Sequence, residues 1–172
     1  MSGFRFRMMA AMFTVRDLFR PPKPVLESFG IGEGMTVVDY GCGPGSFVRA
    51  ASDLAGPSGT VFAVDIHPLA IRTVERITEK DGRTNIHPVL AHGYDSGLQS
   101  GTADLVYALD MFHSIPDPSA FLGELRRITR PAGMLVIDDG HQPRRSTRLK
   151  IIESGSWTIE EETKAYLRCR PA

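Results

Sequence analysis

The apolar positions of this chain alternate between short runs typical of buried strands and longer stretches with helical spacing. Five short runs rich in Val, Ile and Leu predict strands at Met35–Tyr40, Thr60–Asp65, Ile86–Ala91, Ala103–Leu109 and Gly133–Asp139. The stretches between them predict helices at Ser46–Leu54, from Pro68 through Ile71, Val74 and Ile77, and from Asp117 to Arg130, where Pro131 ends the helix. Strands that alternate with helices are typical of βαβ units around a parallel sheet.

The two ends of the chain depart from this alternation. Ser146–Glu153 predicts a helix closed by Gly155, and Trp157–Glu162 and Lys164–Arg170 alternate like the two strands of a hairpin. Ahead of the first strand, Arg7–Phe19 and Pro24–Phe29 predict two helices separated by a proline pair. We expect one domain over residues 1–172, in which residues 1–30 form a helical cover.

Composition narrows the class of protein. The chain has 172 residues, of which 42% are hydrophobic, and its 20 basic and 20 acidic side chains cancel. No global charge therefore favours nucleic acid or an anionic membrane. The two cysteines, Cys42 and Cys169, match neither a disulfide framework nor a zinc site, so a reducing cytoplasm is expected. No apolar run reaches the roughly 18 residues of a membrane span, and the arginine-broken start does not match a signal peptide.

The segment VVDYGCGPGSF, residues 37–47, carries candidate chemistry at the end of the first strand. Its three glycines form G-x-G-x-G, which departs from the dinucleotide fingerprint G-x-G-x-x-G. A strand that runs into such a turn and then a helix presents N–H groups to a ligand. Asp39 would repel a pyrophosphate there, and it favours instead the ammonium of an amino acid whose carboxylate meets the N–H groups. S-adenosylmethionine has such an end, although Asp39 could also cap the turn itself.

Asp65 ends the second strand about twenty residues after the turn, where a carboxylate can accept both hydroxyls of a ribose. The same feature occurs in nicotinamide-binding proteins. It therefore indicates an adenosine-type ligand without choosing between the two.

Four segments in order resemble the class I S-adenosylmethionine-dependent methyltransferases, over residues 24–170. They are VVDYGCGPGSF, VFAVDIHP, ADLVYALDMFHSIPD and RITRPAGMLVIDD. The resemblance is to the small-molecule, quinone-biosynthesis-like branch. It implies an α/β, Rossmann-like, seven-stranded and mostly parallel sheet in the order 3-2-1-4-5-7-6, with helices on both faces and the last strand antiparallel. It also implies S-adenosyl-L-methionine as cofactor and S-adenosyl-L-homocysteine as product.

The resemblance also assigns residues to the donor site. Contacts to the donor are expected from Asp39, Gly41, Cys42, Gly43, Gly45, Asp65, Ile66, His92, Gly93 and Leu109. Considered alone, Cys42 is expected to be a small buried side chain without a chemical role. The family's G-D-A after the third strand is replaced here by AHGYDSG, so the adenine contact falls to His92, Tyr94 or Asp95. No insertion separates the fifth and sixth strands, so a substrate cover must come from the N-terminal segment and the loops.

Candidate catalytic residues follow the fourth and fifth strands, at the end of the sheet where ligands bind in open α/β folds. They are His113, Asp110 and His141. Imidazole titrates nearest to neutral pH, so His113 is the expected general base, Asp110 would orient it or touch the acceptor, and His141 is the reserve. These groups with Asp139 are suitable metal ligands, but a pair of solvated loops is the simpler interpretation and no metal is predicted.

The sequence therefore predicts transfer of a methyl group from S-adenosylmethionine to a small-molecule acceptor. Two alternatives are an NAD-dependent oxidoreductase and a non-catalytic domain that binds an adenosyl ligand. No nucleic-acid partner and no membrane span are expected. The acceptor, its reacting atom and the oligomeric state are not given by these patterns.

Overall fold

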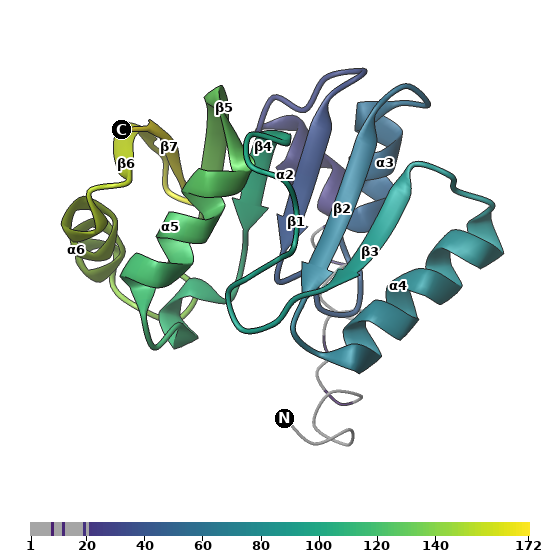
Figure 1. The fold of residues 1–172 in the computed structure, drawn as a ribbon, viewed down its shortest axis with the longest axis horizontal. Coiled ribbons are helices and arrows are strands. Elements are labelled where there is room, and N and C mark those ends of the chain that lie inside the picture. The colour runs from purple at the N-terminus through teal and green to yellow at the C-terminus, as the bar shows by residue number, and fades with distance from the viewer. Residues whose placement is uncertain (1–7, 9–11, 13–18, 20) are drawn as a thin grey trace. The chain divides into compact units, whose positions relative to one another are not determined.

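A computed structural model describes Met8, Met12, Phe19 and residues 21–172, and the chain divides into two compact units (Figure 1). Unit 1 is Met1–Ala91 and unit 2 is His92–Ala172. The helix predicted at Arg7–Phe19 falls almost wholly outside the described residues. The single domain and the N-terminal cover therefore stay predictions.

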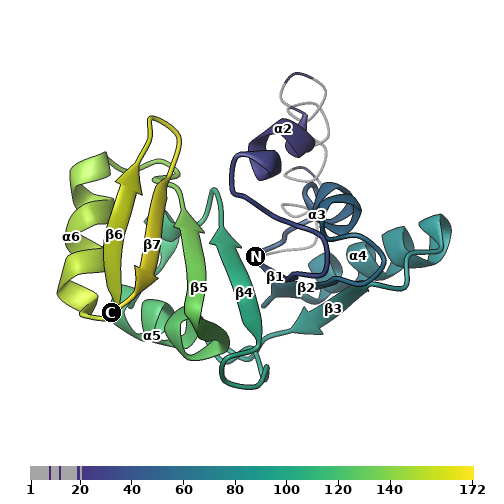
Figure 2. The same ribbon diagram turned by 90° about the horizontal axis from the view of Figure 1, so that it is seen from above.

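Unit 1 is a parallel sheet, β3-β2-β1, whose strands are connected by helices. Its described elements are α2 (Pro22–Glu27), β1 (Thr36–Tyr40), α3 (Val48–Ala55), β2 (Thr60–Asp65), α4 (Pro68–Asp81) and β3 (Ile86–Leu90). Figure 2 shows α3 and α4 on the same side of these strands. The register of β1 on β2 runs from Thr36 opposite Thr60 to Tyr40 opposite Val64. The carboxyl ends of the two strands therefore lie together, and so do the turns that follow them.

Unit 2 contains the remaining four strands, β4-β5-β7-β6. Its elements are β4 (Ala103–Ala108), the short 3-10 helix η1 (Phe112–Ser114), α5 (Pro118–Ile128), β5 (Thr129–Ile137), α6 (Arg144–Ser154), β6 (Trp157–Glu162) and β7 (Leu167–Pro171). β4 and β5 are parallel, whereas β7 is antiparallel to both β5 and β6. The predicted α/β class, with seven strands in the order 3-2-1-4-5-7-6 and an antiparallel last strand, is confirmed.

The prediction that α5 continues to Arg130 and stops at Pro131 is wrong. The helix ends at Ile128, and β5 begins at once with Thr129 and includes Pro131. Proline disfavours helical backbone at the residue before it, so the chain is already extended. The pairing shifts between Ala103–Thr129 and Leu105–Met134, and Pro131 lies within this irregularity, where the regular ladder needs no N–H from it.

The helix ends follow their capping signals more closely. Asp117 accepts the N–H of Ala120 at 3.0 Å at the start of α5. Gly155 ends α6 in the left-handed conformation, as predicted. Within the residues that the structure describes, no helix is long and apolar enough to cross a membrane.

The turn between α3 and β2 leaves no room for a side chain at Gly59. A Cβ there would lie 2.4 Å from Ala55 O and 2.8 Å from Met35 O, both backbone atoms that cannot swing away. We expect Gly59→Ala to lower the free energy of unfolding by roughly 1–3 kcal/mol, the usual effect of overpacking. Urea denaturation followed by circular dichroism measures this change.

Gly123 in α5 provides the matched control, because a Cβ there meets nothing within 4 Å. Gly123→Ala should stabilise the protein by about 0.5–1 kcal/mol through the better helix propensity of alanine. Equal effects from the two substitutions would contradict the described contact at Gly59.

Candidate active site

The turn after β1 requires glycine because of its backbone conformation and its close approach to α4. Gly41, Gly43 and Gly45 have φ values of +85°, +52° and +83°, a region that side chains rarely adopt. A Cβ on Gly45 would also lie 3.0 Å from the Ile77 side chain. The sequence of the turn thus allows a compact path between β1 and α3.

The structure changes the expected role of the glycine N–H groups. Gly41 N and Cys42 N both donate to Val64 O, at 2.8 and 3.0 Å, and Gly43 N donates to Asp65 Oδ2 at 2.9 Å. Gly45 N donates to Cys42 O at 3.0 Å. The first three N–H groups close the turn onto the end of β2, and that of Gly45 bonds within the turn, so none of the four faces a ligand carboxylate. A contact between these glycines and the methyl donor stays a prediction. It would use the backbone surface that is open because glycine has no side chain.

Asp65 stands at the centre of this arrangement. Its half-buried carboxylate accepts Gly43 N at Oδ2 and His67 N at Oδ1, at 2.9 and 2.8 Å. A carboxylate oxygen can accept more than one hydrogen bond, so both oxygens keep capacity for ligand hydroxyls. The next side chain, Ile66, is 64% exposed and offers an apolar surface beside these acceptors. The combination fits a ribose and the flat ring attached to it.

Asp39 brings a second carboxylate to the turn. It lies near the end of β1, opposite Ala63 on β2, and is only 3% exposed. Burial raises the pKa of the nearby Cys42 thiol well above its usual value, and the charges of Asp39 and Asp65 raise it further. The thiol therefore stays protonated, as expected of a buried filler. The electrostatic environment of the turn is negative, which fits a cationic ligand group.

The loop after β3 contains the residues considered for the adenine contact. His92 and Asp95 form a backbone bridge, with N–O distances of 2.9 and 3.1 Å. The Tyr94 hydroxyl accepts Asp117 N at 3.0 Å, and Asp95 Oδ1 accepts Gly97 N at 2.8 Å, so both side chains stabilise unit 2. His92 and Gly93 are exposed. The choice among the three residues stays open.

In unit 2 the candidate catalytic residues lie in the loops after β4 and β5. The half-buried Leu109 and the exposed Asp110 follow β4, and Asp110 has a φ of +59°, the one positive φ at a non-glycine residue among those described. The rings of His113 and His141 meet edge to face, with centroids 4.8 Å apart. The structure thus brings together the two imidazoles that the sequence assigns to different loops.

His113 is held tightly on one side of its ring. Its Nδ1 atom is buried and makes no hydrogen bond within the described part of the chain. It packs so closely on Gly140 that a Cβ there would lie 2.2 Å from it. Burial, and then the neighbouring His141, lower the pKa of His113 below its ordinary value. The ring is therefore neutral at pH 7.

Asp138 is a residue of this cluster to which the sequence patterns assigned no role. Its Oδ1 atom accepts Asp110 N at 2.9 Å and Gly140 N at 3.2 Å. The sequence does contain a signal for this residue. Asp138 directly follows β5, and Asp110 follows the paired parallel strand β4, so the two residues are expected at the same edge of the sheet. Across the described ranges no group of three or more His, Cys, Asp or Glu side chains is placed to hold a metal ion.

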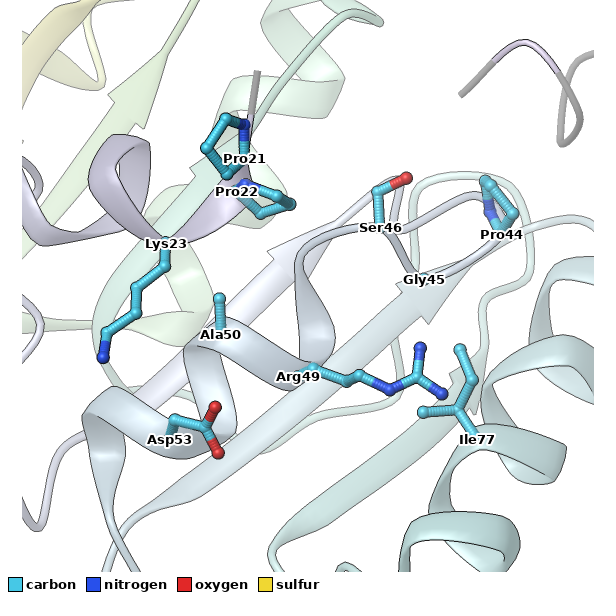
Figure 3. Close-up of a pocket in the computed structure, with 10 residues that line it drawn as sticks. All are labelled: Pro21, Pro22, Lys23, Pro44, Gly45, Ser46, Arg49, Ala50, Asp53 and Ile77. Carbon is cyan, nitrogen blue, oxygen red and sulfur yellow. The ribbon is translucent and has the colours of Figure 1, made fainter. Parts of the chain in front are cut away.

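A cavity of about 460 Å³ lies beside the glycine turn in unit 1 (Figure 3). It is lined by Pro21, Pro22, Lys23, Pro44, Gly45, Ser46, Arg49, Ala50, Asp53 and Ile77. In the figure Arg49 extends toward Ile77, and its Nε donates to Asp81 at 2.5 Å. Among the residues expected to contact the methyl donor, Gly45 alone is in this lining. The cavity is therefore distinct from the cluster around Asp39 and Asp65.

Comparison with known proteins identifies relatives over most of the chain. A family model described as a methyltransferase domain matches residues 31–167. Nocamycin O-methyltransferase of Saccharothrix syringae is 28% identical over 69% of this chain and 43% of its own length. Demethylmenaquinone methyltransferase of Staphylococcus carnosus is 29% identical over 70% of this chain and 49% of its own length. The chain thus spans about half the length of these curated relatives.

A solved structure agrees in fold. The crystal structure of a SAM-dependent methyltransferase from Aquifex aeolicus superposes with a TM-score of 0.83 at 24% identity, covering 88% of this chain and 90% of that one. The family match extends over most of the chain and includes all four segments that carry the sequence resemblance. The chain therefore belongs to the methyltransferase domain family.

Proposed function

We propose that this protein transfers a methyl group from S-adenosylmethionine to a small-molecule acceptor and releases S-adenosylhomocysteine. The observation that carries the proposal is the Asp65 carboxylate. It is fixed by Gly43 N and His67 N, keeps acceptor capacity on both oxygens, and is followed by the exposed Ile66. Family membership supports the same reaction.

The donor side would be formed by unit 1. When bound, S-adenosylmethionine supplies a methyl group on a sulfonium that is already electrophilic. Asp65 would accept the two ribose hydroxyls, Ile66 would cover the adenine, and Asp39 would favour the ammonium directly or through water. The protein's main contribution is positioning of the acceptor, an effect worth at most roughly 7–11 kcal/mol.

The acceptor side would be formed by the loops after β4 and β5. A hydroxyl or protonated amine needs a base within about 3 Å of the nucleophile or one water away. His113 is the proposed base because its lowered pKa leaves it neutral at pH 7. Its buried Nδ1 faces Gly140, so a proton could be accepted only at Nε2, in the tautomer that carries its hydrogen on Nδ1. Asp110 would orient the ring or the acceptor, with His141 as the alternative base.

The class of acceptor is inferred from the relatives, two of which are named for methylation of nocamycin and of demethylmenaquinone. Both names support a small organic acceptor. A cytoplasmic location belongs to the same proposal, and it is supported by two buried cysteines that are not joined to each other.

Ligand binding tests the proposal directly. S-adenosylhomocysteine should bind with a dissociation constant of about micromolar, or roughly −8 kcal/mol, whereas NAD should not bind. Isothermal titration calorimetry measures both. Tight binding of NAD without a response to either adenosyl ligand would support an oxidoreductase instead. Binding of S-adenosylhomocysteine without label transfer from a methyl-labelled donor to any pooled metabolite would support a non-catalytic domain.

Replacing Asp65 should affect both donor affinity and stability. Asp65→Ala removes the proposed ribose contact, and the affinity for S-adenosylhomocysteine should fall by roughly 1.5–3 kcal/mol, the scale of a charged hydrogen bond. It also leaves Gly43 N and His67 N without their acceptor, so the free energy of unfolding should fall by about 1–3 kcal/mol.

Asp53→Ala is the control in the same unit, because it removes a carboxylate, 51% exposed, that pairs with Arg83 and does not contact Gly43 N or His67 N. It should leave affinity and stability nearly unchanged. Calorimetry and urea denaturation follow both variants, and unchanged affinity in Asp65→Ala would exclude the assigned role of this carboxylate.

The proposed base predicts a kinetic signature. His113→Ala should retain binding of S-adenosylhomocysteine while turnover of the true acceptor falls about a hundredfold or more. Because a base must be neutral, wild-type kcat should rise with pH through a pKa below the ordinary value of a histidine and then level off. In His113→Ala this rise of kcat with pH should be absent. Turnover that survives with an unaltered pH profile would mean that no base acts at this position.

A further inference from the structure

The loops that follow β4 and β5 are joined by one carboxylate, that of Asp138. Its Oδ1 atom accepts Asp110 N from the loop after β4 at 2.9 Å, and Gly140 N from its own loop at 3.2 Å. Asp110 has a left-handed backbone, with a φ of +59°, which is unfavourable for a side chain other than glycine. The hydrogen bond from Asp110 N to Asp138 Oδ1 fixes the N–H of this left-handed residue.

A second contact joins the same loops. The His113 ring, on η1, packs against Gly140, where a Cβ would lie 2.2 Å from Nδ1. The ring also meets His141 at a centroid distance of 4.8 Å. Asp138 thus binds one partner of this contact, Gly140, directly, and it binds Asp110, three residues before the other partner, His113.

We propose that Asp138 is a positioning residue for the acceptor side, because it ties the loop that carries Asp110 and His113 to the loop that carries Gly140 and His141. The inference rests on the proposed function as far as turnover is concerned. The tie between the loops can be tested without any substrate.

The charges around Asp138 make this tie sensitive to pH. The ionisable groups near it are Asp110 from the loop after β4, Asp139 next along the chain, and His113, whose ring packs on Gly140. Burial raises the pKa of Asp138 to about 6, and the hydrogen bond from Asp110 N lowers it by more than the Asp110 carboxylate raises it. The ionised form therefore holds the loop more strongly. Below about pH 6 the carboxyl is neutral and its hydrogen bonds weaken, since charged acceptors bind roughly twice as strongly.

Nuclear magnetic resonance of the ¹⁵N-labelled chain tests the tie. The amide signals of Asp110 and Gly140 should titrate together with a midpoint of about 6. In Asp138→Asn the side-chain oxygen can still accept both N–H groups but does not ionise, so this titration should vanish. In His113→Gln it should persist, which separates the carboxyl from the imidazole. In Asp138→Ala both amides should exchange with solvent about tenfold faster or more.

Turnover adds a readout that a purely structural residue would not change. With a methyl acceptor, Asp138→Ala should lower kcat about tenfold with unchanged affinity for S-adenosylhomocysteine, and Asp138→Asn should recover most of the loss. Asp104→Asn is the control, because it removes a carboxylate of unit 2 that pairs with Arg130 on β5. It should change neither the amide signals nor kcat.

A midpoint near 6 that persists in Asp138→Asn, or amides that stay protected in Asp138→Ala, would overturn the proposal. If Asp138→Ala does not fold, the Asp138→Asn titration still decides. If the wild-type chain methylates no acceptor, the proposed function is wrong. The amide measurements then still test whether Asp138 links the two loops.

Discussion

An aspartate at the carboxyl end of one strand accepts the N–H of a left-handed residue in the turn after the neighbouring strand, and this interaction occurs in both units. In unit 1, Asp65 accepts Gly43 N, whose φ is +52°. In unit 2, Asp138 accepts Asp110 N, whose φ is +59°. Each aspartate also accepts the N–H two residues further along its own chain, from His67 and Gly140 respectively. Each carboxylate therefore links two turns that the sheet brings side by side.

These hydrogen bonds explain why Asp65 and Asp138, which are charged side chains, occupy partly buried positions beside the two turns. A partly buried N–H without a partner costs about 1–3 kcal/mol, and for Gly43 and Asp110 the acceptor comes from the neighbouring strand end instead of from their own turn. A carboxylate at the next strand end meets that need, at the expense of its own desolvation. Burial and neighbouring aspartates raise the pKa of Asp138 in unit 2. The same two causes raise the pKa of the Cys42 thiol in unit 1.

Periodicity and capping signals predicted the strands and most helix limits because each depends on residues close in sequence. Pro131 was misread because its effect depends on the pairing of β5 with β4, which local pattern does not contain. The direction of the glycine N–H groups was also misjudged. G-x-G-x-G specifies the turn, whereas the acceptors Val64 O and Asp65 come from another strand. For the same reason the sequence indicated Asp110, His113 and His141 as neighbours at one strand end, but not that Asp138 and Gly140 join their loops.

The contact between His113 and Gly140 has a consequence for sequence variation in related chains. No side chain fits at position 140 while an imidazole occupies position 113, because the added carbon would overlap the ring. A side chain at position 140 therefore requires the ring at position 113 to move or to be replaced, although 27 positions separate the two residues in the sequence. A chain with a larger residue at position 140 should therefore lack an imidazole in this place. A designer who grafts this loop onto another scaffold must transfer both residues together.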